Sequence, residues 1–140
     1  MISKKTFEEI LQGDTAQFDV DITEDIVGGF ASLSGDYNPM HVNREYAAST
    51  PFGGRIAHGM IAGALFSRLV GVYLPGKYCL YLSQTLQFKK PIRIGATVTV
   101  EGAVTQKTEA TRTVTLSTLL RAKADGEILV EGQALVRLLQ

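Results

Sequence analysis

Cysteine and histidine are scarce in this chain of 140 residues, and neither positive nor negative side chains are in excess. The single cysteine, Cys79, excludes an intramolecular disulfide and a zinc site built from cysteines. The two histidines, His41 and His58, exclude a metal centre with three histidine ligands. The 14 Lys and Arg residues balance 14 Asp and Glu residues, and a net charge of zero gives no support for a nucleic-acid or an anionic-membrane binder.

Long apolar runs are also missing. The longest, residues 60–74, contains Arg68 and is too short to cross a bilayer. The first 13 residues carry two lysines but no apolar segment of signal-peptide length. The sequence therefore predicts a soluble protein of the cytoplasm, or of a similar reducing compartment, without a membrane partner.

What the chain does have is an ordinary globular composition, with 45% hydrophobic and 20% charged residues. Its length suits one domain, which we place at residues 1–140. A chain of this size buries roughly two-thirds of its unfolded surface, so it needs no disulfide or metal to hold a core together.

The first half of the chain predicts one strand and several helices. Residues 15–22 alternate polar and apolar side chains and predict a half-buried strand. Thr23 is a typical N-cap for a helix that ends at Ser34–Gly35. Residues 35–54 predict loop, apart from one helical turn that Asn43 caps. Residues 57–73 are apolar on nearly all sides, which predicts a central, buried helix.

After residue 76 the pattern changes to that of strands. Four segments are rich in Thr, Val, Leu and aromatic residues: residues 78–88, 97–105, 113–122 and 128–138. Asp125–Gly126 predicts a two-residue hairpin turn between the last two. Strands joined by short turns form an antiparallel sheet, and its apolar face needs the long helix as a partner. We therefore expect an α+β fold in which the sheet wraps around that helix.

The segment from Ser34 to His41 brings Asp36, Asn38 and His41 together in one predicted loop. These residues also suit a plain turn, since Asp and Asn bond their own backbone and Pro39 fixes the exit. Taken alone, the segment leaves a structural role and a catalytic role open.

A second segment, residues 53–60, places two glycines and His58–Gly59 at the start of the predicted buried helix. A helix N-terminus offers unpaired backbone N–H groups, and a glycine lets a ligand oxygen approach them, as in an oxyanion hole. The alternative is that Gly59 and Gly63 only allow close packing and that His58 bonds local backbone.

Together the two segments resemble the signature of MaoC-like, R-specific enoyl-CoA hydratases, from about residue 15 to the C-terminus. Two departures are small: Met40 replaces the more usual aliphatic residue before the histidine, and Ala96 stands where an acidic residue often follows the glycine. Neither removes a polar group that the chemistry needs. The residues that carry the resemblance are Phe30, Leu33, Ser34, Gly35, Asp36, Asn38, Pro39, Met40, His41 and Ala47, then residues 55–60 and 88–95.

The resemblance implies a hot-dog fold, in which an antiparallel sheet wraps around a long central helix, and a homodimer. It implies reversible hydration of trans-2-enoyl-CoA to (R)-3-hydroxyacyl-CoA without a cofactor or metal, in fatty acid metabolism and polyhydroxyalkanoate precursor supply. It also implies that Asp36 and His41 form a catalytic dyad around one water, that Asn38 orients them, and that the Gly59 N–H stabilises the thioester oxygen.

The resemblance further implies an acyl tunnel, although ordinary core and surface roles stay open for each residue. Lysines and arginines at strand ends and loops are candidates for the CoA phosphates. The candidate wall residues are Ala62, Leu65, Phe66 and Tyr81, and the candidate phosphate ligands are Arg55, Lys89, Lys90 and Arg93.

Three other functions fit the same scaffold, because one fold hosts many activities. They are a hot-dog acyl-CoA thioesterase, a dehydratase acting on a 3-hydroxyacyl group carried by acyl-carrier protein (ACP), and a non-catalytic acyl-CoA-binding module. The spacing of Asp36 and His41 favours a hydratase over a thioesterase, and a pure binding module needs neither side chain.

Overall fold

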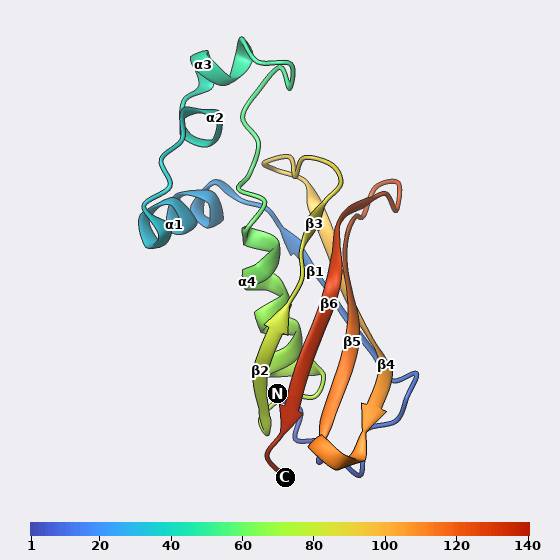
Figure 1. Ribbon diagram of the computed structural model, residues 1–140. Coiled ribbons are helices and arrows are strands. Elements are labelled where there is room, and N and C mark those ends of the chain that lie inside the picture. Colours follow the sequence, from blue (N-terminus) through green and yellow to red (C-terminus); the bar gives the residue numbers. More distant parts are fainter.

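An antiparallel sheet of six strands forms the framework of the computed structural model, which describes residues 1–140 (Figure 1). The sheet order is β1-β4-β5-β6-β2, and β3 also pairs with β6. The strands are β1 (Thr15–Asp21), β2 (Cys79–Gln84), β3 (Gln87–Phe88), β4 (Thr97–Thr108), β5 (Thr113–Ala122) and β6 (Ile128–Leu138).

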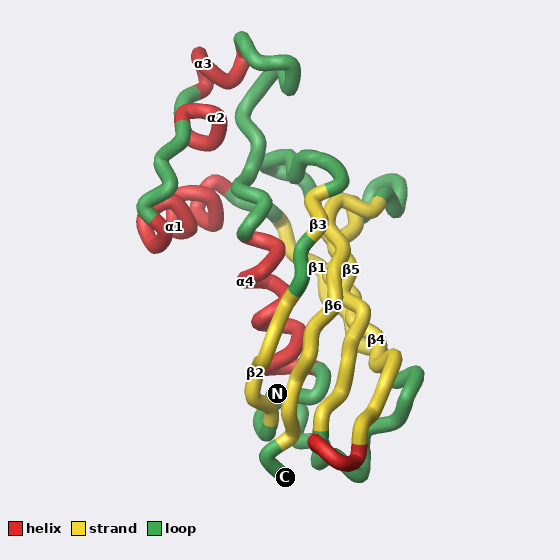
Figure 2. The backbone as a smooth tube through the Cα atoms, in the orientation of Figure 1, coloured by secondary structure: helices red, strands yellow, loops and turns green.

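Four α-helices lie between β1 and β2, and only the last of them lies along the sheet. Helices α2 and α3, with the long loop that follows them, extend beyond one end of the sheet, and α1 lies to the side of the start of α4 (Figures 1 and 2). The helices are α1 (Glu24–Ser34), α2 (Pro39–Val42), α3 (Arg44–Ala48) and α4 (Ile61–Arg68), followed by the π-helical turn η1 (Leu69–Tyr73) and the short 3-10 turn η2 (Glu109–Thr111). The predicted α+β class, with a helix against an antiparallel sheet, is confirmed.

The core has two parts. In the first, Phe66 and Ala62 of α4 pack against the inward side chains of the central strands, and both are fully buried. In the second, Phe7 and Ile10 close the other end of the sheet, although they precede the first strand. No periodic pattern in this N-terminal segment predicts that burial.

The predicted ends of α1 are confirmed by its caps. The Thr23 hydroxyl accepts a hydrogen bond from Ile26 N–H at 3.2 Å. Gly35 ends the helix with φ +76°, a left-handed conformation that glycine adopts without a steric penalty. Asn43 caps α3 through Tyr46 N–H, as its position predicts.

The central helix differs from the prediction at its start and on its outer face. Residue 57 is extended rather than helical, because Ala57 N–H donates to the Ile92 carbonyl at 2.8 Å. Regular helix therefore begins only at Ile61. The expectation that the helix is buried on all sides is wrong for this chain, since Ala64 and Ser67 are exposed on the face away from the sheet.

The strand predicted for residues 78–88 is interrupted at Thr85 and Leu86, between β2 and β3. The Thr85 carbonyl oxygen lies against Gly132 of β6. A Cβ atom on residue 132 would lie only 1.8 Å from this oxygen, so the close approach requires a glycine. The hairpin between β5 and β6 is present, but its loop is longer than two residues. Ala122 N–H bonds Glu127 O, and Gly126 N–H bonds Ala122 O.

No helix combines the length and the apolar character that crossing a membrane requires.

Candidate active site

The loop after α1 holds Asp36 in a tight turn. One carboxylate oxygen, Oδ1, accepts a hydrogen bond from Asn38 N–H at 3.1 Å. The backbone N–H of Asp36 donates to the Ser34 hydroxyl at 3.1 Å. The second carboxylate oxygen has no partner within the chain and is exposed, so it is free to bind a water or a substrate.

The turn that follows directs the next polar residues. The Asn38 side-chain oxygen caps α2 by accepting from Met40 N–H at 3.0 Å. Pro39 occupies the first turn of α2, where a backbone N–H has no partner within the helix, so the missing N–H of proline costs no hydrogen bond. The capping contact gives Asn38 a structural role, and its part in orienting the dyad stays a prediction.

His41 lies on α2 and is fixed through one ring nitrogen. Its Nδ1 lies 2.7 Å from the Ile56 carbonyl oxygen, which can only accept, so Nδ1 carries the proton. In the neutral ring, Nε2 therefore keeps a lone pair and can accept a proton. A ligand atom of Asp36 and one of His41 lie within 4.8 Å of each other, close enough for one water to contact both.

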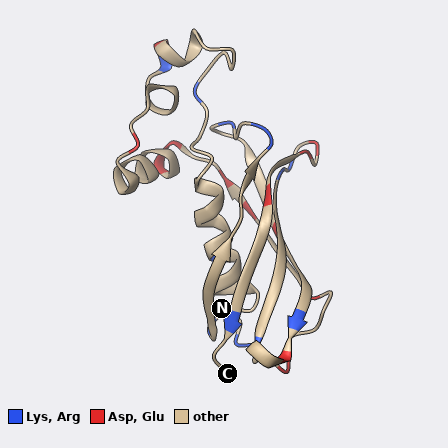
Figure 3. Cartoon of the chain, in the orientation of Figure 1, with Lys and Arg blue, Asp and Glu red and all other residues tan.

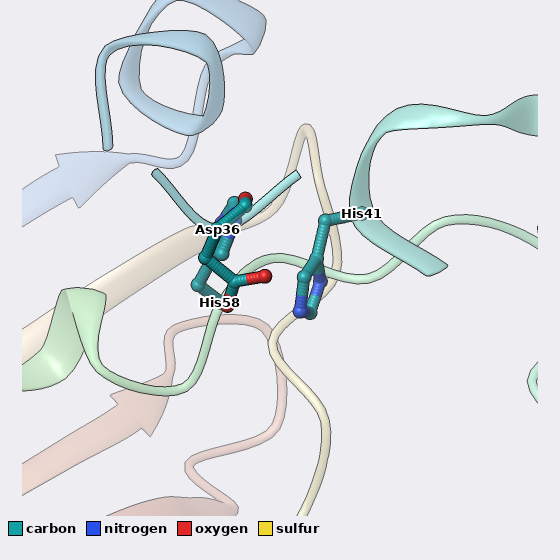
Figure 4. Close-up of side chains that lie close together, drawn as sticks. All are labelled: Asp36, His41 and His58. Carbon is teal, nitrogen blue, oxygen red and sulfur yellow. The ribbon is translucent and has the colours of Figure 1, made fainter. Parts of the chain in front are cut away.

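His58 is the third polar residue of the cluster and is buried, with 2% of its surface exposed. Its Nε2 lies 2.9 Å from the backbone carbonyl oxygen of Asp36, 22 positions earlier in the chain. Its ring stacks on that of His41, with the centroids 4.0 Å apart and the planes 30° apart (Figure 4). The in-plane lone pairs of two stacked rings run side by side and do not converge, so this arrangement does not suit chelation of a metal ion by both.

Gly59 precedes α4, and its N–H donates to no acceptor within the chain. The first bonds of the helical turn run from Ile61 N–H to His58 O and from Ala62 N–H to Gly59 O. The Gly59 N–H is thus one of the unpaired donors at the positive end of the helix. The Phe88 ring lies against this glycine, at 2.8 Å from where a Cβ would be.

A pocket of about 460 Å³ joins His41 to Gly59. Asp36 does not line it, but its carboxylate is near the His41 ring, which does. The other lining residues are mostly apolar and include Phe52, Ile56, Ala57, Met60, Phe88, Lys89, Lys90, Pro91, Ile92 and Val130. The arrangement can hold a small acyl group with its carbonyl beside a backbone donor and its reacting carbons beside two proton-transfer groups.

The four residues predicted for the acyl wall do not line this pocket. Ala62 and Phe66 are fully buried against the sheet, and Leu65 packs against the same core. Tyr81 donates to the Gln84 side chain, and burial raises its pKa to about 12, so it stays protonated at neutral pH. Their role as tunnel wall stays a prediction.

The cations predicted to meet phosphates are mostly engaged in ion pairs. Lys89 pairs with Glu131 at 3.2 Å, and Lys90 pairs with Glu127, which raises the pKa of Lys90. Figure 3 shows basic residues in the loop that follows β3 and acidic residues in the hairpin between β5 and β6.

The two remaining candidate phosphate ligands bond elsewhere. Arg55 pairs with Glu24, and Arg93 donates to the Phe52 carbonyl at 2.8 Å. Binding phosphate would therefore require each of these four side chains to exchange a present partner.

Sequence reasoning missed most of the pocket lining. Phe52, Phe88 and Val130 come from a loop and two strands that are far apart in the chain. No periodicity links such positions. Phe88 does fall within the segment that carries the family resemblance, which is the only signal that pointed to it.

Known protein sequences match this chain over most of its length. A family model described as "MaoC like domain" matches residues 7–124. The chain is 42% identical to an (R)-specific enoyl-CoA hydratase of Rhodospirillum rubrum over 130 residues, which cover 93% of this chain and 89% of the relative.

Two solved structures are similar over nearly the whole chain. The unliganded R-hydratase PhaJ1 from Pseudomonas aeruginosa gives a TM-score of 0.90 at 38% identity, covering 95% of this chain and 84% of that one. The (R)-hydratase from A. caviae involved in PHA biosynthesis gives a TM-score of 0.90 at 39% identity, covering 94% of this chain and 98% of that one.

Proposed function

The chain belongs to the MaoC-like domain family, and from that membership we propose that it is an R-specific enoyl-CoA hydratase that uses Asp36 and His41. The enzyme is a hydro-lyase that interconverts trans-2-enoyl-CoA and (R)-3-hydroxyacyl-CoA, and its fold is the hot-dog fold of its relatives. The observation that carries the assignment of residues is the free Nε2 of His41 beside the Asp36 carboxylate, in a pocket that also holds an unpaired backbone N–H.

The proposed reaction begins with one water between Asp36 and His41. The water oxygen attacks Cβ of the enoyl group, and one water proton moves to Nε2 of His41 while Asp36 accepts a hydrogen bond from the other. The electron pair of the double bond moves towards the carbonyl and forms an enolate.

The enolate oxygen is where charge develops, so a donor placed there lowers the barrier. We assign this donor to the Gly59 N–H, which has no partner in the chain and lies at the positive end of α4. The proton held on His41 then passes to Cα, which completes addition of one water and restores the neutral imidazole. Delivery of both parts of the water by one pair of side chains favours addition from a single side of the double bond.

An absorbance assay with crotonyl-CoA tests the proposal. We expect rapid loss of enoyl absorbance without release of thiol, and oxidation of the product by an R-specific 3-hydroxyacyl-CoA dehydrogenase. Release of thiol would instead identify a thioesterase. If neither crotonyl-CoA nor a series of longer enoyl-CoA and enoyl-ACP substrates reacts, the proposed hydratase activity is contradicted and a binding module is favoured. Activity with enoyl-ACP alone would identify the ACP dehydratase.

We also propose that the enzyme is a homodimer. Strand β2 forms one edge of the sheet, and its Leu80 and Leu82 are about half exposed, at 50% and 48%. Pairing of two such edges would cover both strands and extend the sheet across the dimer.

We propose a cytoplasmic location and a role that links fatty acid intermediates to polyhydroxyalkanoate precursors. The single cysteine supports a reducing compartment, because it has no partner for an intramolecular disulfide. Burial also raises the pKa of the Cys79 thiol, which disfavours its reactive thiolate form.

A further inference from the structure

His58 makes two contacts that the proposed reaction does not use. Its Nε2 bonds the backbone carbonyl of Asp36 at 2.9 Å, and its ring stacks on that of His41. One buried side chain thus contacts both members of the proposed dyad. Neither contact supplies a proton to the substrate, so their effect must be on the positions of Asp36 and His41.

The bond from His58 is the only hydrogen bond that ties residues 35–38 to a distant part of the chain. Gly35 N–H bonds Ala31 O, and Tyr37 N–H bonds Gly35 O. The remaining bonds of these residues also join positions at most four apart. Since the other bonds of this exposed loop are local, the bond from His58 is the one that ties its backbone directly to the body of the protein.

The place of His58 in the chain makes this contact more significant. It directly precedes Gly59, whose N–H we assign to the enolate oxygen. The bond therefore fixes the separation between the Asp36 carboxylate and the oxyanion donor. His41 is bonded to the same segment through Ile56 O at 2.7 Å. The positions of Asp36, His41 and the Gly59 N–H therefore all depend on residues 56–59.

The second ring nitrogen of His58, Nδ1, indicates that a histidine is not needed at this position for packing alone. Because the Asp36 carbonyl can only accept, Nε2 carries the proton, and Nδ1 of the neutral ring is a bare acceptor. This Nδ1 is buried and has no hydrogen-bond partner. The Phe30 ring lies near the His58 ring, with the centroids 4.9 Å apart. A phenylalanine at position 58 would fill this apolar site without leaving a buried polar atom unpaired.

We infer that His58 is a positioning residue, which holds Asp36 and His41 at the distance from Gly59 N–H that the reaction needs. The inference rests on the proposed hydratase function. It predicts that losing the Nε2–H donor slows turnover without weakening the fold or the binding of substrate.

Two substitutions separate the donor from the ring. His58→Phe keeps a ring of similar size and removes the donor, whereas His58→Gln removes the ring and keeps an N–H at the position of Nε2. We expect His58→Phe to lower kcat for crotonyl-CoA at least about tenfold, the order of effect of one lost hydrogen bond. KM should stay within about twofold, and the thermal midpoint should not fall. His58→Gln should recover most of the lost kcat.

Three controls make the outcome decisive. Phe30→Leu changes packing next to His58 without removing the donor and should keep kcat within about twofold. If His58→Phe does not fold, His58→Leu takes its place as the apolar variant. A wild-type enzyme without hydratase activity would overturn the proposed function rather than this inference. With an active wild type, an apolar variant that keeps kcat, or a glutamine variant no better than the apolar one, would overturn the positioning role.

Discussion

At the scale of single residues, the two side chains proposed to contact the water are each held by one atom and free at another. Asp36 is held through Oδ1 by Asn38 N–H, and His41 through Nδ1 by the Ile56 carbonyl. The free atoms are Oδ2 and Nε2. In each side chain, one atom holds the local structure and a different atom contacts the water. A substitution can therefore remove the contact with the water and keep the structural hydrogen bond.

Asp36→Asn tests this separation. An asparagine oxygen can still accept from Asn38 N–H, so the turn and the fold should persist. The loss of the charged oxygen, which accepts a hydrogen bond from the attacking water, should lower kcat/KM by about 10²-fold, because the water loses one of the two groups that position it. The measurement is the rate of crotonyl-CoA hydration beside thermal unfolding. Asp25→Asn, the same change at an exposed carboxylate of α1, is the matched control and should keep full activity.

Gly59→Ala tests the oxyanion donor. The added Cβ would lie 2.8 Å from the Phe88 ring, so the ring or the backbone must shift. We expect kcat to fall at least about tenfold, since an oxyanion donor contributes about 10²–10³-fold and only its position is disturbed.

Gly63→Ala is the matched control, because its Cβ would meet only Leu86 at an ordinary 3.6 Å. It should keep activity and stabilise the helix by about 0.5–1 kcal/mol. Equal activity of both alanine variants would contradict the role of Gly59.

At the scale of elements, a segment without regular structure closes one end of the sheet. Phe7 and Ile10 are fully buried, and Lys107 of β4 donates to both of their carbonyls at 2.8 and 2.6 Å. Asp14, just before β1, accepts from Lys5 at 2.7 Å and from Leu11 N–H at 3.0 Å. These polar contacts orient the segment so that its two apolar side chains reach the core.

The ion pair of Asp14 gives a pH-dependent prediction. The bond from Lys5, helped by Leu11 N–H, lowers the pKa of Asp14 below its usual 3.8. A carboxylate with a lowered pKa stabilises the folded state above its usual pKa, and that contribution disappears as the pH falls through the folded-state value. Asp14→Asn should therefore be less stable than wild type at pH 7, and the difference should shrink at acidic pH. Urea unfolding at several pH values measures it, and a difference independent of pH would contradict the assignment.

At the scale of the whole molecule, the single chain leaves apolar surface uncovered on its β2 edge, just before α4 and on β3. Met60 is 54% exposed and Phe88 also 54%, beside the pocket that holds the proposed site. A second copy that covered this region would exclude water from the reacting groups as well as bury the edge strand.

Leu82→Lys tests the dimer at the β2 edge. A charge on an edge strand opposes pairing with a second edge. We expect the variant to shift from dimer towards monomer in light scattering after size exclusion. Leu11→Lys, a change at an exposed leucine that precedes β1 and lies outside the edge strand, should leave the mass unchanged. A dimer of unchanged stability with lysine at position 82 would contradict an interface at this edge.

Local patterns in the sequence determined the strands, the helix caps and the grouping of Asp36 with His41. Thr23, Gly35 and Asn43 act through neighbours at most four residues away, so their roles can be inferred from sequence. Alternating side chains predicted the sheet for the same reason. The family resemblance added the catalytic reading of the loop, which turn chemistry alone had left open.

Only the tertiary structure decided the contacts between segments that the chain keeps apart. The bond from His58 to the Asp36 carbonyl, the extended Ala57 held by Ile92, and the place of Phe88 against Gly59 all join residues more than 20 positions apart. Such contacts depend on how the sheet curves past the helix and the loop, and a periodic pattern carries no information about that. The sequence therefore determined which groups could do the chemistry, and the fold decided what holds them in place.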